Sequence, residues 1–159
     1  MRVGQVLDFR ILGPLEVLED GERVELGDEL QKTFLAVLLV KPGRVVPLER
    51  LAEATGASFA ALRRHASDLQ ETLGAEILEA RPSGYRVQLK PGQLDVDRFR
   101  VLVGAARGLT PGAQEKLRHA LALWRGPALA DFTDRPFAQD AIAELEQLHR
   151  RAEARLRAG

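Results

Sequence analysis

Cysteine is absent from the 159 residues, and methionine, tryptophan and tyrosine occur only once each. The lack of cysteine excludes disulfides and thiolate metal ligands. The apolar run at residues 34–40 is far shorter than the roughly 20 residues that a membrane-spanning helix needs. The N-terminal residues lead into no long apolar segment of the kind that marks a secretory signal peptide. We therefore expect a cytoplasmic protein that does not associate with membranes.

An excess of charge of either sign is also missing, because 23 basic residues balance 23 acidic ones. The two halves of the chain differ, however. Residues 8–89 hold 10 basic and 14 acidic side chains, whereas residues 90–159 hold 12 basic and 9 acidic ones. DNA-binding domains normally carry a basic surface, since neutralising phosphates supplies much of their affinity. The composition of the first half, taken alone, argues against DNA binding.

The signatures of common enzymes are missing too. The sequence contains no G-x-S-x-G, no glycine-rich phosphate loop followed by Lys-Ser/Thr, and no histidine pair at metal-binding spacing. Its histidines, His65, His119 and His149, fall in three separate predicted helices. The neighbouring acids Asp95 and Asp97 fit the start of a helix better than a catalytic pair. We expect no enzyme activity, no metal and no cofactor.

Two β-hairpins are predicted in the first half of the chain. Residues 9–17 are rich in β-forming side chains, and Asp20-Gly21 is a two-residue turn signal. Residues 24–26 supply the returning strand of this first hairpin. The second hairpin is predicted from residues 77–79 and 85–89.

Between the hairpins, apolar residues recur at helical spacing and predict three helices. The first spans 28–40 with Asp28 as its N-cap, and the second spans about 47–55. The third begins at Ser58 and has five apolar residues on one face, namely Phe59, Leu62, Ala66, Leu69 and Leu73. Hairpin, three helices and hairpin, in this order, indicate a winged helix-turn-helix domain at 8–90.

After the expected boundary at Lys90-Pro91-Gly92, only helices are predicted. Asp95 can cap the first, Thr110-Pro111 opens the second, and a long third helix follows Pro136. The third helix carries an apolar stripe at Phe137, Ala141, Leu145, Leu148, Ala152 and Leu156. Antiparallel helices of this size are the units of tetratricopeptide-like arrays. We therefore predict an α+β chain in which a winged helix precedes a small all-α domain at 93–159.

Four segments of the sequence resemble a known family. Residues 9–17 (FRILGPLEV), 43–46 (GRVV) and 81–85 (RPSGY) resemble the N-terminal domain of the antibiotic regulatory proteins of actinomycetes. Residues 122–131 (ALWRGPALAD) resemble the bacterial transcriptional activator domain that follows it in this family. The resemblance implies a response-regulator-type winged helix that binds direct repeats upstream of biosynthetic promoters. It also implies that the adjoining helical domain serves dimerisation.

The sequence departs from the family pattern at three places. Residues 51–58 are fewer than in the family, whose longer loop there contacts RNA polymerase, and this favours a modulator or repressor. Asp68, Gln70 and Glu71 stand where the family's recognition helix is usually basic. The family's activator domain normally continues beyond three helices, so we expect a truncated form of it here.

The helix at 58–73 is the candidate recognition helix. Arginine, histidine and serine on its polar side can read base edges in the major groove, and arginines near the second hairpin can contact phosphates. The candidate DNA-binding residues are Arg63, Arg64, His65, Ser67, Arg81, Arg86, Lys32 and Arg44. Asp68 and Glu71 on the same side repel phosphates, unless one of them accepts a hydrogen bond from a cytosine amino group.

Two other functions remain open from the sequence. The acidic first half fits a degenerate winged helix that serves as a protein-interaction or scaffold module and no longer binds DNA. A weaker alternative is a small-molecule-binding or biosynthetic protein. The stripe of the last helix either packs on the preceding helices or leaves part of itself as a surface for a homodimer or a partner protein. The residues of that candidate interface are Phe137, Leu145, Leu148 and Leu156.

Overall fold

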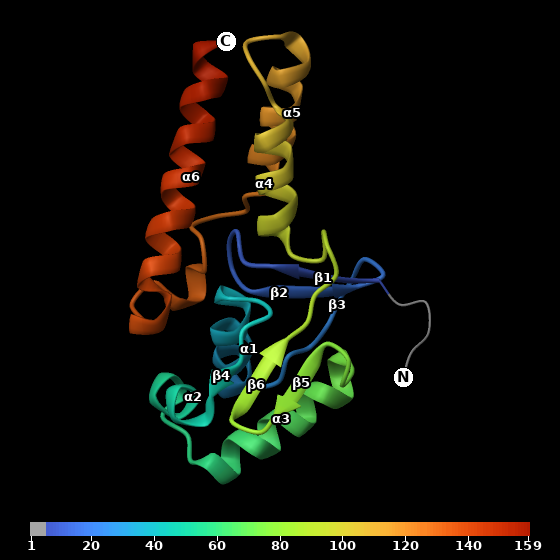
Figure 1. Ribbon diagram of the computed structural model, residues 1–159, viewed down its shortest axis with the longest axis vertical. Helices are drawn as coiled ribbons and strands as arrows, with labels where there is room; N and C mark the ends of the chain where they lie inside the picture. The colour runs from blue at the N-terminus through green and yellow to red at the C-terminus, as the bar shows by residue number, and fades with distance from the viewer. Residues whose placement is uncertain (1–5) are drawn as a thin grey trace.

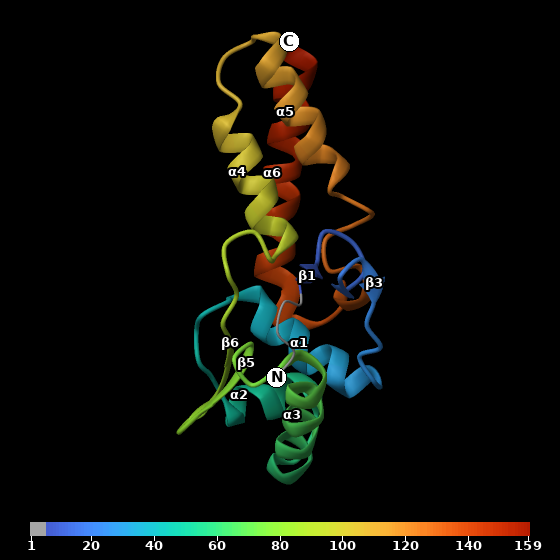
Figure 2. The ribbon, with the colours of Figure 1, turned by 90° about the vertical axis from the view of Figure 1, so that its right-hand side faces the viewer.

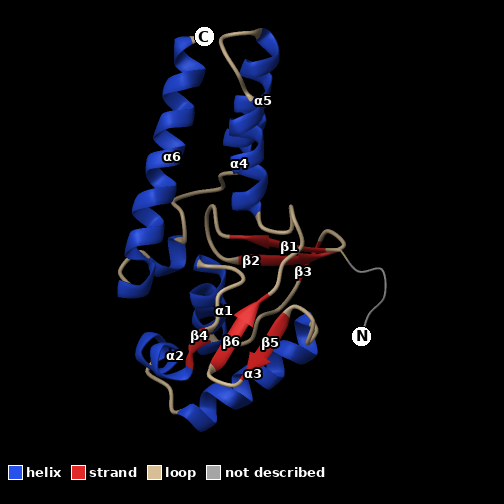
Figure 3. Ribbon diagram, in the orientation of Figure 1, coloured by secondary structure: helices blue, strands red, loops and turns tan. Residues whose placement is uncertain are grey.

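The computed structural model describes residues 6–159, with a winged-helix part below and a helical part above (Figure 1). The strands are β1 (Leu7–Arg10), β2 (Glu16–Glu19), β3 (Glu22–Arg23), β4 (Val46–Pro47), β5 (Leu78–Arg81) and β6 (Gly84–Val87). The helices are α1 (Glu29–Val40), α2 (Leu48–Thr55), α3 (Phe59–Leu73), α4 (Asp95–Ala105), α5 (Pro111–Ala122) and α6 (Gln139–Ala158), with short 3₁₀ turns η1 (Ala130–Phe132) and η2 (Pro136–Ala138). The predicted α+β class is confirmed, with the strands gathered in the lower part (Figure 3).

The first sheet is antiparallel, with the strand order β1-β2-β3. Asp20 and Gly21 have φ angles of 52° and 87°, the left-handed conformation that a two-residue hairpin turn requires. The sequence predicts the returning strand at 24–26, and this position is wrong. The tight turn pairs Glu22 directly with Glu19, so that the returning strand β3 already ends at Arg23.

The three predicted helices are present, and α1 lies at the centre of the lower core. Asp28 caps α1 by accepting a hydrogen bond from the Gln31 N–H at 3.0 Å, and all residues at 33–39 are buried. Ser58 caps α3 in the same way. Phe59 is predicted on the buried face of α3 but is 40% exposed. It is the first residue of the helix, and the buried residues of α3 begin only at Leu62.

The second sheet, with the strand order β4-β6-β5, forms the wing. Its β5–β6 hairpin projects beside α3 (Figure 2). A Cβ on Gly84 would fall 1.9 Å from the Val46 carbonyl oxygen, so only glycine allows β4 and β6 to approach this closely. At the tip, the Ser83 carbonyl accepts from the Leu48 N–H at 3.1 Å. The hairpin is therefore fixed to the start of α2.

The upper part consists of α4, α5 and α6, which run side by side (Figures 1 and 2). Thr110 caps α5 as predicted, accepting from the Ala113 N–H at 3.1 Å. No helix within residues 6–159 combines the length and apolar character needed to cross a lipid bilayer.

The apolar stripe of α6 and η2 faces the interior of the chain. Leu145 is buried, and the other three members of the expected interface, Phe137, Leu148 and Leu156, are half-buried and pack against the core. Phe137 also contacts Phe132, with ring centroids 5.6 Å apart. The stripe packs against the chain's own core and leaves Phe137, Leu148 and Leu156 partly exposed, so its role as a surface for a partner stays a prediction.

Candidate nucleic-acid interface

One face of α3 lies open at the lower end of the molecule (Figure 1). Arg63, Arg64 and Ser67 are exposed there, as expected from the helical period. All three belong to the N-terminal and central turns of the helix, the part that usually contacts base edges in helix-turn-helix proteins. Their side chains are hydrogen-bond donors of the kind that read bases in the major groove.

His65 does not belong to this face. It is only 9% exposed, and its Nδ1 has no hydrogen-bond partner within residues 6–159. It lies three residues after Leu62 and four before Leu69, both of which are buried, so the helical period turns it inward. The prediction of His65 as a DNA-binding residue is therefore corrected.

The C-terminal half of the same face is acidic. Asp68 is exposed, and its Oδ2 accepts a hydrogen bond from the side-chain amide of Gln31 on α1, at 3.3 Å. Glu71 borders a hollow of about 360 Å³ whose other acidic residues, Glu19, Glu22 and Glu25, come from the region of the β2–β3 hairpin. The exposed face of α3 therefore changes from basic to acidic along its length.

The wing places one arginine in the open and pairs the other. Arg81 is exposed at the end of β5. Arg86 lies opposite Glu79 in the hairpin, and its Nε is 2.5 Å from Glu79 Oε2. Its side chain is 25% exposed, so Arg86 primarily supports the hairpin. Gln70 does not point out from the exposed face of α3 but donates to the Leu78 carbonyl at 2.9 Å, which ties α3 to β5.

The two remaining candidate basic residues lie in different elements, Lys32 on α1 and Arg44 in the loop that follows it. Arg44 is exposed in the loop before β4. The Gly43 N–H in that loop donates to the Val87 carbonyl at 2.9 Å, which anchors the loop to the wing sheet. Lys32 is half-buried on α1, next to the Gln31 that contacts α3.

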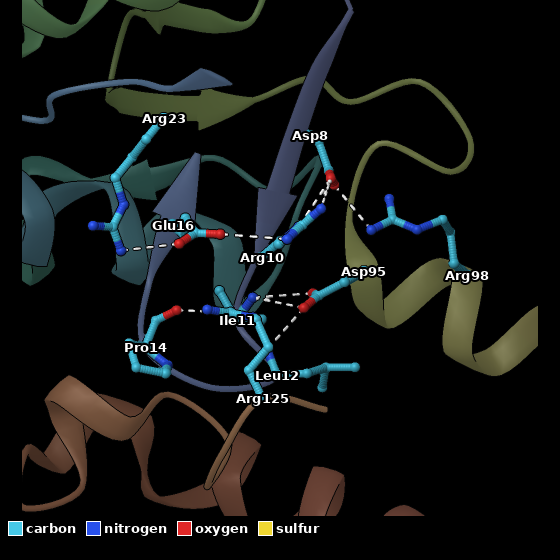
Figure 4. Close-up of polar contacts among 10 residues, drawn as sticks. All are labelled: Asp8, Arg10, Ile11, Leu12, Pro14, Glu16, Arg23, Asp95, Arg98 and Arg125. Carbon is cyan, nitrogen blue, oxygen red and sulfur yellow. Dashed lines mark hydrogen bonds and ion pairs between the residues drawn. The ribbon is translucent and has the colours of Figure 1, made fainter. Parts of the chain in front are cut away.

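A buried carboxylate joins the winged helix to the helical part (Figure 4). Asp95 Oδ1 accepts from the Ile11 N–H at 3.0 Å, and Asp95 Oδ2 accepts from the Leu12 N–H at 2.9 Å. The sequence predicts Asp95 as a helix cap, but Leu94 is the N-cap of α4 and Asp95 reaches across to the end of β1. Burial raises the pKa of Asp95, although both N–H donors and the nearby Arg125 favour its ionised form.

Arg125 extends this junction from the other side (Figure 4). Its backbone N–H donates to the Leu12 carbonyl at 2.8 Å, and its guanidinium donates to the Pro14 carbonyl at 2.7 Å. Leu129 adds a backbone bond to the Ile11 carbonyl, also at 2.8 Å. The chain segment after β1 is thereby held between α4 and the loop that follows α5.

Sequence patterns do not predict that these residues join the two parts of the chain. They belong to the segments 9–17 and 122–131, which resemble the family, and to the start of α4. Asp131 makes a further contact between the two segments, because its Oδ2 accepts from the Leu15 N–H at 3.0 Å. The two segments therefore meet at the junction and not on the open face of α3.

Comparison with known proteins extends this similarity. Residues 94–159 match the family described as the bacterial transcriptional activator domain. The transcriptional regulatory protein EmbR of Mycobacterium tuberculosis is 32% identical over 175 residues, covering 96% of this chain and 45% of EmbR. The regulatory protein AfsR of Streptomyces coelicolor is 35% identical over 145 residues, covering 84% of this chain and 14% of AfsR.

A solved structure, Mycobacterium tuberculosis EmbR in complex with a low-affinity phosphopeptide, superposes with a TM-score of 0.84 at 30% identity. The match covers 94% of this chain and 44% of that chain. The chain thus spans less than half the length of EmbR and a smaller share of AfsR. Because the similarity runs through the winged helix, the junction and the helices alike, the chain belongs to the same family as these relatives, that of the actinomycete antibiotic regulatory proteins.

Proposed function

We propose that the chain regulates transcription in the cytoplasm by binding operator DNA, with α3 in the major groove and the wing against the backbone. The observation that carries this proposal is the exposure of Arg63, Arg64 and Ser67 on the leading half of α3. Arginine pairs bidentately with guanine, and a serine hydroxyl can donate to or accept from a base edge, so these residues suit base contacts. Arg81 and Arg44 are exposed near the wing sheet and suit phosphate contacts.

The connection between α2 and α3 supports a modulating or repressing role. Only residues 56–58 separate Thr55 from Phe59, and Gly56 ends α2 in the left-handed conformation. So short a connection offers little surface to RNA polymerase. The chain then acts on transcription by occupying DNA, and not by recruiting the polymerase through this loop.

The direct test measures DNA binding against salt by fluorescence anisotropy, with a random duplex and with DNA from upstream of the chain's own gene. We expect affinity that falls steeply with salt, because phosphate contacts release counterions. Replacing Arg63 and Arg64 together by alanine should weaken binding to the upstream DNA by about 1–3 kcal/mol for each base that an arginine reads.

The matched control replaces Arg150 and Arg151, which are exposed neighbours on α6, by alanine. This variant removes the same charge, far along the chain from α3, and should bind as the unchanged protein does. Equal reductions in affinity for both double variants would show that α3 makes no specific contact and that only net charge matters.

A protein-interaction module without DNA binding is the second candidate, and the acidic half of the α3 face favours it. Replacing Asp68 and Glu71 by arginine distinguishes the two functions. If the unchanged chain fails to bind DNA at low salt and this variant binds, the acids have disabled the surface and the fold serves protein contacts.

The proposal also covers the oligomeric state of the protein and the bounds of its two domains. We propose, on the basis of the family, a homodimer or a complex with a partner protein through the C-terminal helices, where Phe137, Leu148 and Leu156 are partly exposed. A monomeric mass by sedimentation at tens of micromolar would contradict the homodimer. We also propose that the chain consists of two domains, a winged helix at residues 8–90 and a helical domain at residues 93–159.

A further inference from the structure

We infer that Asp68 selects a base, accepting a hydrogen bond from the exocyclic amino group of a cytosine in the major groove. The inference rests on the proposed function and deepens it, since it assigns specificity to an acidic residue on a helix expected to be basic. Three features support it, namely the position of Asp68, the way its carboxylate is held and the donors that each base offers.

Asp68 lies on the side of α3 that carries the candidate base contacts. It is exposed, follows Ser67 directly and stands four residues after Arg64. Four residues advance a helix by about 6 Å and return to the same face. Base pairs are about 3.4 Å apart along the duplex, so Arg64 and Asp68 reach base pairs about two steps apart.

The carboxylate is held by a neutral donor and keeps its charge uncompensated. The Gln31 side-chain amide donates to Oδ2 at 3.3 Å, from a different helix. Within residues 6–159, no cation pairs with Asp68, and its Oδ1 accepts no hydrogen bond from the protein. One oxygen is therefore positioned by α1, and the other is free to accept from a ligand.

An ionised carboxylate is an acceptor only, and this limits which base it tolerates. Guanine presents two acceptors in the major groove, and thymine presents an acceptor and a methyl group. Adenine places its N7 acceptor beside its amino group, whereas cytosine offers an amino donor alone. Cytosine is thus the base that satisfies Asp68, and each of the others leaves a repulsive or unpaired contact.

Glu71 provides the contrast. It is exposed on the same side of α3, three residues after Asp68, but it borders the acidic hollow near the β2–β3 hairpin. No hydrogen bond like that from Gln31 holds it among the described residues. We expect Glu71 to repel DNA generally, without preference for a base.

The experiment selects bound duplexes from a randomised pool with the full chain, the Asp68→Asn variant and the Glu71→Gln variant. Each variant removes one negative charge and keeps nearly the same shape. The unchanged chain should enrich cytosine at one position. Asp68→Asn should reduce that preference about tenfold or more and enrich adenine there, because asparagine pairs bidentately with adenine.

Glu71→Gln should tighten binding several-fold to all duplexes and leave every base preference unchanged. A third variant, Gln31→Ala, keeps the charge and removes the support, so it should weaken discrimination for cytosine without favouring adenine. Circular dichroism confirms that each variant is folded.

Two results would overturn the inference while leaving DNA binding intact. One is an unchanged cytosine preference in Asp68→Asn, and the other is a uniform gain in affinity equal to that of Glu71→Gln. Either would mean that Asp68 acts through charge alone. Failure of all proteins to bind any duplex would contradict the proposed function itself, and with it this inference.

Discussion

Replacing Asp95 by asparagine tests whether the buried carboxylate holds the two parts of the chain together. An asparagine oxygen can replace Oδ2, which accepts from both Leu12 N–H at 2.9 Å and Ile11 N–H at 3.1 Å. Its amide nitrogen, however, would take the place of Oδ1 and point a donor at the Ile11 N–H, now 3.0 Å away. A buried donor left without an acceptor costs about 1–3 kcal/mol. We expect the free energy of unfolding to fall by that amount.

The loss of stability caused by Asp95→Asn should become smaller as pH rises. Burial raises the pKa of Asp95 above its ordinary value of 3.8, despite the N–H donors and Arg125. Between 3.8 and the higher pKa of the folded state, the folded chain binds more protons than the unfolded chain. Its stability therefore decreases as pH rises through this window. Asparagine does not titrate, so the advantage of aspartate is largest at the acidic end of the window and smallest above it.

Urea unfolding, followed by tryptophan fluorescence at several pH values, measures both effects. Asp97→Asn is the matched control, because Asp97 lies in the same first turn of α4 and its carboxylate makes no hydrogen bond or ion pair within residues 6–159. It should cost about 0.5 kcal/mol or less through the helix dipole. Equal destabilisation of the two variants, or an advantage of aspartate that grows with pH in the window, would refute the reasoning.

Two further predictions concern stability. Gly84→Ala should destabilise the chain by about 2 kcal/mol or more, since its Cβ would meet the Val46 carbonyl oxygen at 1.9 Å. Gly104→Ala, in α4 with nothing within 4 Å of its Cβ, should stabilise the chain by about 0.5–1 kcal/mol. The urea unfolding midpoints of the two variants check both predictions. Equal effects of the two substitutions would contradict the close approach of β4 and β6. Arg155 donates to the Val103 and Ala106 carbonyls at the end of α4, so Arg155→Ala should cost about 1–2 kcal/mol. Thermal unfolding compares it with Arg157→Ala, and a similar change in both would argue against this role.

Features that depend on neighbouring residues can be predicted correctly from the sequence. Asp28, Ser58 and Thr110 each cap a helix by accepting from an N–H three residues later. Asp20-Gly21 makes its turn because both residues tolerate positive φ. These contacts form within a few residues, so local sequence specifies them.

Features that depend on distant residues are harder to predict. Asp95 has the composition of a helix cap, yet it bonds to residues more than 80 positions earlier, and no periodicity reports such a contact. The apolar stripe of α6 does not reveal which surface covers it. His65 differs, because its inward position follows from the spacing of Leu62 and Leu69. On the candidate site, helical spacing places Arg63, Arg64 and Ser67 outward, but the Gln31–Asp68 contact depends on the packing of α1 against α3.

The hydrogen bonds around Asp95 and Arg125 have a consequence for the geometry of regulation. They leave the helical part little freedom to move relative to α3. In the DNA complex proposed above, α4, α5 and α6 would therefore keep one fixed orientation around the duplex. Any contact that these helices make with a neighbouring DNA-bound protein then depends on rotational phase. Moving the neighbour's site by half a helical turn breaks the contact, and moving it by a whole turn of about 10 base pairs restores the alignment.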